Sequence, residues 1–299
     1  MFFRNLQLYR LADHPGSAEQ FAVYLNRHVF QPCSSLMKES HGWIPPRGDD
    51  RLVFTLAGHW LIALGTEQKL LPASVVRQEV QQRVADIEAR TGLRPGKKRV
   101  REMRDEVTDE LLARAFSRYQ TTFAWIDPEG KWLALDASSP KKANDFVELL
   151  RKSADELGFE PLKTARAPSS AMAEWLSERD GPPGFSIDRE CVLQSPLEEK
   201  ATVRYTHHPL LDTDEIRNHI TAGKVPIRLA MTWEGRISFA LTEKLELKKL
   251  QFLDVNEDSG SGDADSAEER FESDFALMTT MLGKFLTDLV ATLGGEEEA

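Results

Sequence analysis

The sequence predicts an α+β fold, with mixed strand and helix domains interrupted by an antiparallel helical finger. Residues 2–11 alternate apolar and polar side chains, as a strand does. Residues 74–119 carry two apolar stripes of helical spacing, separated by a turn that contains glycine and proline. Residues 267–293 repeat apolar side chains every three or four positions. The expected units are a central α+β domain of residues 1–73 plus 120–165, the helical finger of residues 74–119, and a C-terminal α+β base domain of residues 166–299.

The first 73 residues are expected to combine short strands with one helix. After the strand at 2–11, Ser17 is a candidate N-cap for a helix that continues to Phe30. Residues 31–50 contain three prolines and two glycines, so we expect mostly loop there. Residues 51–64 have the pattern of two short strands around Gly58.

The finger is predicted from its caps and its two stripes. Ser74 is a candidate cap for a first helix, and Gly92 stands where a left-handed C-cap would end it, with Pro95 after the turn. The second helix is expected from about Lys97 to Tyr119. Both stripes are narrow, which predicts a hairpin on the order of 30 Å long whose helices pack mainly on each other.

The remaining elements follow from turn residues and periodicity. Residues 121–136 indicate a β-hairpin, residues 139–157 a helix with Pro140 in its first turn, and residues 158–200 irregular chain with a short helix near 171–177. The C-terminal expectations are a helix capped by Asp212 or Thr213 and ending at Ile220, a hairpin of 224–231 and 236–241 turning at Glu234-Gly235, a strand at 246–253, an irregular acidic segment at 254–268, and the long helix at 267–293.

A cluster of basic residues lies in this otherwise acidic chain. Between residues 90 and 104 there are seven Lys or Arg side chains against Glu102 alone, although the whole chain has a net charge of -10. Residues 254–299 hold thirteen acids and two bases, which leaves residues 1–253 close to neutral at +1. The low isoelectric point therefore describes the C-terminal region and does not exclude nucleic-acid binding elsewhere.

Further basic groups lie on a predicted helix at 139–157 and near the hairpin at 224–241. No aromatic residues alternate with them, so contacts to the phosphate backbone are favoured over base stacking. Ordinary solvated helix faces remain the alternative, with Lys98 paired to Glu102 and Arg101 to Asp105. The candidate DNA-binding residues are Arg94, Lys97, Lys98, Arg99, Arg101, Arg118, Lys141, Lys142, Arg151, Lys152, Lys224 and Arg228.

The chain contains no recognisable catalytic, nucleotide-binding or metal-binding motif. GxGxxG, the P-loop, HExxH and GxSxG are all missing, so we expect neither an enzyme nor a cofactor. His207, His208 and His219 lack supporting ligand spacing, and the acids of 254–265 depart from a calcium loop. The two cysteines, Cys33 and Cys191, form neither a CxxC pair nor a disulfide framework. No segment has the apolar length of a membrane span, and no signal peptide is expected.

Several separated runs resemble the family of recombination-associated RdgC proteins of proteobacteria. They are FFRNLQLYRL at 2–11, GWIPP at 42–46, RAFSR at 114–118, KKA at 141–143, LLRKS at 149–153, HITAGK at 219–224, FESDFALM at 271–278 and GGE at 294–296. The resemblance covers the whole chain. It implies a non-enzymatic protein that binds double-stranded DNA without sequence preference and forms a ring-shaped homodimer around the duplex. It further implies a cytoplasmic, nucleoid-associated protein that restrains RecA-mediated recombination and supports replication.

The resemblance also carries a few residue roles. Phe116, in the RAFSR run, matches an aromatic residue at one of the family's two dimer contacts; the alternative is ordinary core at the base of the finger. Lys141, Lys142, Arg151 and Lys224 match basic positions of the family, whereas the His207-His208 segment departs from it. Two other functions stay open from the residues alone. They are a metal-dependent nuclease that uses the acids of 254–265, and an adaptor whose basic finger binds an acidic protein.

Overall fold

The computed structural model describes residues 2–196, 201–211, 214–253 and 267–297. In chain order the elements are β1 (Leu6–Leu11), α1 (Ala18–Asn26), β2 (Glu39–Ile44), β3 (Phe54–Leu56), β4 (His59–Lys69), α2 (Ala73–Thr91), α3 (Lys97–Leu112), β5 (Ser117–Asp127), β6 (Trp132–Asp136), α4 (Pro140–Ser153), β7 (Phe159–Pro161), α5 (Pro168–Glu178), β8 (Phe185–Gln194), β9 (Thr202–Tyr205), α6 (Glu215–Thr221), β10 (Val225–Trp233), β11 (Ile237–Thr242), β12 (Leu247–Phe252) and α7 (Ala267–Thr292).

One antiparallel sheet runs through the whole body, so the mixed α+β prediction is confirmed. Its strand order is β2-β4-β5-β6-β1-β12-β11-β10-β8-β9, with β3 and β7 paired to β4 and β1 beside this path. The N-terminal and C-terminal halves meet where β1 pairs with β12, at Leu6 opposite Leu247. The sheet is therefore continuous across residue 165, where we expected a domain boundary; the division into domains itself stays a prediction.

Helices cover the two faces of this sheet unequally. An apolar cluster that contains Phe21 of α1 and Phe146 of α4 packs on one face of the N-terminal half, and it includes no side chain of β8–β12. A larger cluster packs α5 and α7 on the opposite face of both halves. The strands β8–β12 are here called the base sheet. One face of the base sheet is covered by α5 and α7, and the cluster around α1 and α4 does not extend over its other face.

The long helix α7 supplies much of the larger core. Phe275, Leu282, Phe285 and Leu289 are almost fully buried, and each contributes about 1.5–3 kcal/mol by leaving water. Among the described helices, α7 alone has the length and apolar composition that a membrane span would need, and half of its apolar window is buried inside the molecule. No segment of this apolar length was expected from the sequence, but the helix predicted at 267–293 has it, and the structure packs that helix on the sheet as part of the core.

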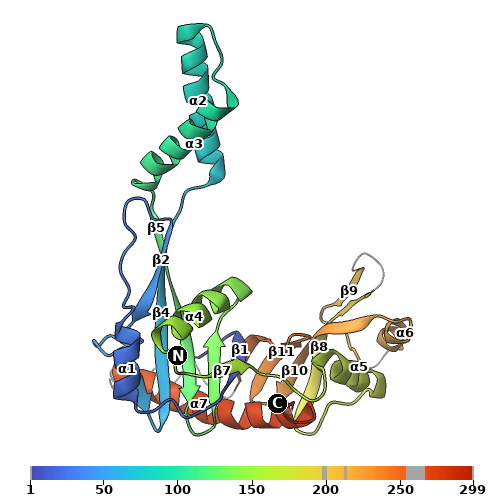
Figure 1. The fold of residues 1–299 in the computed structure, drawn as a ribbon. Helices are drawn as coiled ribbons and strands as arrows, with labels where there is room; N and C mark the ends of the chain where they lie inside the picture. The colour runs from blue at the N-terminus through green and yellow to red at the C-terminus, as the bar shows by residue number, and fades with distance from the viewer. Residues whose placement is uncertain (1, 197–200, 212–213, 254–266, 298–299) are drawn as a thin grey trace.

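The finger, α2 and α3, projects from the body on the ends of β4 and β5 (Figure 1). Its two helices bury Val76, Val80, Val84, Met103 and Val107 against one another in a separate cluster, as their narrow stripes predicted. The finger stands on a stalk in which residues 65–69 of β4 pair with residues 117–121 of β5 on one side and, as far as Gln68, with β2 on the other.

Several local predictions are confirmed at their capping residues. The Ser17 side chain accepts a hydrogen bond from Gln20 N and begins α1, and Gly92 ends α2 in the left-handed region at φ 69°. Glu234 and Gly235, at φ 44° and 68°, turn the hairpin of β10 and β11. Both cysteines are free thiols, as expected.

Two finger boundaries were wrong. The cap before α2 is Pro72, with Ser74 inside the helix. The second helix ends at Leu112, because Arg118 and Tyr119 pair with Gln68 and Glu67 across the stalk. Long-range strand pairing therefore overrides the local helical spacing.

Three strands were missed in segments expected to be loop or irregular chain: β2, β7 and β8. In β2, Gly42 looked like a loop signal, but a Cβ at this position would lie 2.2 Å from Phe30 Cα, so glycine allows two backbones to approach closely. The candidate caps Asp212 and Thr213 and most of the acidic segment 254–268 lie outside the described residues.

Candidate nucleic-acid interface

The tip of the finger concentrates cations at the start of α3. Arg94 lies in the turn, and Lys97, Lys98 and Arg101 lie in the first turns of the helix; all four are exposed. The first turn of α3 has no acidic residue, and Gly96 provides no side-chain cap. Cations near a helix N-terminus oppose the helix dipole, so this arrangement weakens the helix end. Such a local conflict is typical of a functional site.

The charges on the finger are only partly neutralised. Arg99 donates to Glu106 at 2.9 Å and to Glu102 at 3.4 Å, and these bonds raise its pKa, with Glu106 the main cause. Arg94, Lys97, Lys98 and Arg101 make no ion pair with a described carboxylate. The alternative pairs of Lys98 with Glu102 and of Arg101 with Asp105 are therefore not formed in the described part of the chain, and Arg99 pairs with Glu102 instead.

The stalk carries an exposed apolar patch next to the predicted contact residues. Phe116 is 83% exposed and Tyr119 is 66% exposed, with Leu70 at 48% beside them; Leu70 N donates to Phe116 O at 2.8 Å. This exposure excludes the alternative that Phe116 is core at the base of the finger. Arg118, two residues further along β5, is also exposed.

A buried carboxylate holds the segments that display this patch. Glu67 is 3% exposed and accepts hydrogen bonds from Ser117 Oγ at 2.5 Å and Cys33 N at 2.7 Å. The bond from Ser117, followed by that from Cys33, lowers the pKa of Glu67. Because Ser117 adjoins Phe116, Glu67 fixes the backbone that presents the aromatic side chain.

On α4 the predicted cations differ in their partners. Lys141 is held by Glu39, 2.7 Å away, and by Asp145 at 3.4 Å, and the bond to Glu39 is the main reason that its pKa is raised. Arg151 donates to Phe159 O at 3.3 Å and lies over the ring of the same residue. By contrast, Lys142 and Lys152 form no ion pair with any carboxylate that the structure describes.

The base sheet brings together cations that are far apart in the sequence. Val192 of β8 pairs with Arg204 of β9 on one side and with Arg228 of β10 on the other, so both arginines share its face. They line a cavity of about 110 Å³ together with Lys249 of β12. Arg228 Nε is buried without a hydrogen-bond partner in the described chain. The next residue of β10, Leu229, points to the opposite face of the sheet and packs toward α5 and α7.

The predicted DNA-binding residues include Arg228 but not Lys249. No local signal in the sequence marks Lys249. Strand pairing and a backbone φ of 53° bring its side chain to the cavity. Its ammonium pairs with Glu190 at 2.8 Å and lowers the pKa of that carboxyl. Lys224 lies just before β10, outside the cavity lining.

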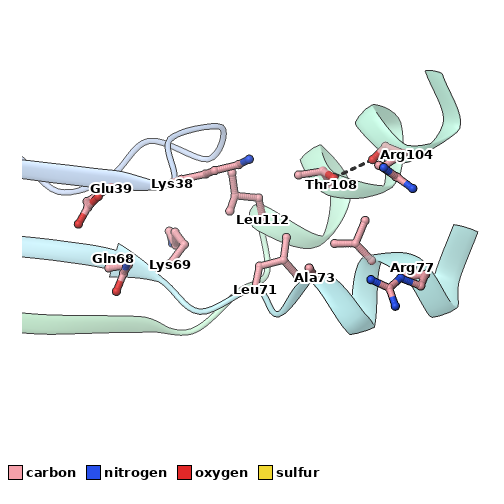
Figure 2. Close-up of a pocket in the computed structure, with 11 residues that line it drawn as sticks. Lys38, Glu39, Gln68, Lys69, Leu71, Ala73, Arg77, Arg104, Thr108 and Leu112 are labelled. Carbon is pink, nitrogen blue, oxygen red and sulfur yellow. Dashed lines mark hydrogen bonds between the residues drawn. The ribbon is translucent and has the colours of Figure 1, made fainter. Parts of the chain in front are cut away.

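A second basic pocket, of about 470 Å³, opens where the finger meets the stalk. Figure 2 shows Lys38, Lys69, Arg77 and Arg104 around a floor that includes Leu112. None of these four cations forms an ion pair within the described residues. Glu39 also lines the pocket but is paired with Lys141, so the four cations leave an excess of positive charge that suits an anionic group. The sequence gives no sign of this pocket, because its cations come from four segments that are far apart along the chain.

The fold and these surfaces define a class: an α+β protein built on one sheet, with a helical finger and exposed cationic faces. Comparison with known proteins identifies the family. The model of the family described as "Putative exonuclease, RdgC" matches residues 1–296. The "Recombination-associated protein RdgC" of Dechloromonas aromatica (strain RCB) is 47% identical over 99% of this chain and 98% of its own. The protein of the same name from Janthinobacterium sp. (strain Marseille) is 48% identical over 100% of this chain and 99% of its own. The chain belongs to the RdgC family, which confirms the resemblance.

Proposed function

We propose that this protein binds double-stranded DNA without sequence preference and acts in recombination. The observation that carries the proposal is the placement of unpaired cations on three separate elements: the finger tip, α4 and the base sheet. A duplex presents a regular array of phosphates, and cations spread over a long surface suit it better than they suit a small ligand. The name of the relatives, recombination-associated protein, supports the same process.

The protein acts as a closed homodimeric ring. Seen in outline, the molecule is angular, with the finger rising at one end and β9 at the other (Figure 1). A ring of two identical chains needs two different isologous contacts, one at each end. The exposed patch around Phe116 suits the first contact, and the C-terminal strands and helix provide the second. Such a ring encircles the duplex and restrains a RecA filament by blocking its access, which also supports replication.

The protein works in the cytoplasm on the nucleoid, and it is not an enzyme. Its contacts hold the duplex by backbone charge and leave the phosphodiester bonds intact. The acids of 254–265, on which the nuclease alternative depends, lie outside the described residues.

The test compares closed circular DNA with linear fragments of unrelated sequence at increasing salt. Binding should be equal among sequences, and contact with about six phosphates gives a log–log salt slope of roughly -5. Circles should be retained at salt concentrations that release linear DNA. One preferred sequence or a flat salt response would overturn the proposal. Binding of an acidic protein in place of DNA would favour the adaptor.

A further inference from the structure

Three metal-donor side chains converge on the side of the body next to the stalk. Glu39 and His41 are two residues apart on β2 and so lie on one face of that strand. Asp145 of α4 faces them, and donor atoms of the three side chains all lie within 4.8 Å of one another. Their side chains are 26–27% exposed, which makes the group half-buried.

The imidazole of His41 is held so that one nitrogen faces the carboxylates. Its Nδ1 lies 3.1 Å from Thr66 Oγ1, and its Nε2 lies 3.9 Å from Glu39 Oε1. When Nδ1 carries the hydrogen and donates it to Thr66, Nε2 keeps its lone pair, and a ligand can use it within 3.9 Å of Glu39 Oε1. A hydrogen bond of this kind, from the far nitrogen of a histidine, commonly fixes the tautomer of a metal ligand.

A cation already occupies the space between the two carboxylates. Lys141 Nζ lies 2.7 and 2.9 Å from the two oxygens of Glu39 and 3.4 Å from Asp145 Oδ2. A cavity of about 140 Å³ adjoins it, lined by polar side chains that include Thr66, Gln68 and Ser139. That volume holds several water molecules, which could complete a coordination sphere.

We propose that Glu39, His41 and Asp145 bind a divalent transition-metal ion, and that Lys141 is the internal cation that leaves when the ion enters. One imidazole with two carboxylates suits Zn²⁺, Co²⁺ or Mn²⁺ better than Mg²⁺ or Ca²⁺, which prefer oxygen ligands alone. Ligand bonds of about 2.0–2.2 Å require the donors to close in by rotation of their side chains.

Replacement of Lys141 by the metal ion also makes this surface more positive. The resulting effect on DNA binding rests on the proposed function. The ion neutralises both carboxylates and releases the Lys141 ammonium beside Lys142. Metal loading would therefore strengthen the contact of α4 with DNA. Metal binding itself is measured without DNA, so failure of the DNA-binding proposal leaves the metal site testable.

The test is a titration of the full chain, freed of metal by a chelator, with Co²⁺ followed by visible absorption and with Zn²⁺ followed by calorimetry. Asp145→Asn should weaken binding at least tenfold, because it removes one charged ligand. Lys141→Ala should tighten binding at least fivefold, because the competing cation is gone. Lys152→Ala removes the same charge from the other end of α4 and should leave the affinity unchanged within twofold.

Equal affinity in the wild type and Lys141→Ala would overturn the exchange, and undiminished binding by Asp145→Asn would overturn the site. The histidines at 207, 208 and 219 are common to all variants, so any background binding there cancels in the comparison. Thermal unfolding checks that each variant folds. Glu39→Gln replaces Asp145→Asn if the latter does not fold.

Discussion

Reversing two charges at the finger tip should weaken DNA binding while leaving the finger at least as stable. The change is Lys97→Glu with Lys98→Glu, both exposed in the first turn of α3. Each phosphate contact adds about 0.9 to the magnitude of the slope of log affinity against log salt concentration. Loss of two contacts therefore lowers that magnitude by about 1.8. At 0.1 M salt the counterion contribution alone then weakens binding by roughly 60-fold.

The same substitution should not harm the fold. Acids in the first turn interact favourably with the helix dipole by about 0.3–1 kcal/mol each, and α3 has no acid there. Arg99 is left unchanged because its bonds to Glu106 and Glu102 tie one turn to the next.

A matched control makes the same change in net charge on α7, which lies far from the finger tip. Arg270→Glu with Lys284→Glu alters two exposed residues of α7, of which Arg270 also lies in a first turn. Affinity is measured by fluorescence anisotropy with a labelled duplex at several salt concentrations, and stability by thermal unfolding. Equal slopes for the finger variant and the α7 control would refute the assignment of the finger tip to DNA.

Three further predictions test the assembly, the chemistry and the stalk. Phe116→Ala should yield a folded but open dimer that binds linear DNA and loses its hold on circles, since an interface aromatic contributes about 2 kcal/mol or more; sedimentation showing a closed ring would place the contact elsewhere. Plasmid incubated with Mg²⁺, Mn²⁺ or Ca²⁺ should stay intact, and nicking that Asp258→Ala abolishes would establish the nuclease instead. Glu67→Gln should lower the melting temperature at pH 7. Because the folded pKa of Glu67 is lowered, its contribution is present above the unfolded pKa of about 4.3 and is lost as pH falls through the folded value. The variant should therefore show a flatter decline in stability below pH 5, and an unchanged acid-unfolding curve would contradict this role.

The elements that depend on neighbouring residues could be predicted from the sequence. The helical hairpin of the finger follows from its apolar spacing and from Gly92, and the hairpin of β10 and β11 follows from Glu234-Gly235. The basic character of the finger tip also follows from the sequence, because charge is a property of the residues themselves. These features need only contacts within a few positions along the chain, which is why pattern and turn chemistry suffice.

Strand pairing could not be predicted in the same way. β2 contains Gly42 and precedes two prolines, so its local pattern indicated a loop, yet it pairs with β4 along six residues. The second helix of the finger was extended too far because β4 takes Arg118 and Tyr119 into the stalk. A strand gains its stability from a partner that is distant in sequence, and no local window contains that partner.

The sequence by itself determined which residues carry charge, where the helices turn and that a helical finger interrupts the fold. Only the tertiary structure decided which charges are available: it pairs Lys141 with Glu39 and leaves the Lys142 ammonium without an ion-pair partner among the described residues. It also exposes Phe116 and gathers Arg204, Arg228 and Lys249 around one cavity. The physical reason is that ion pairing and burial depend on distances across the fold, and sheet register sets those distances between segments far apart along the chain.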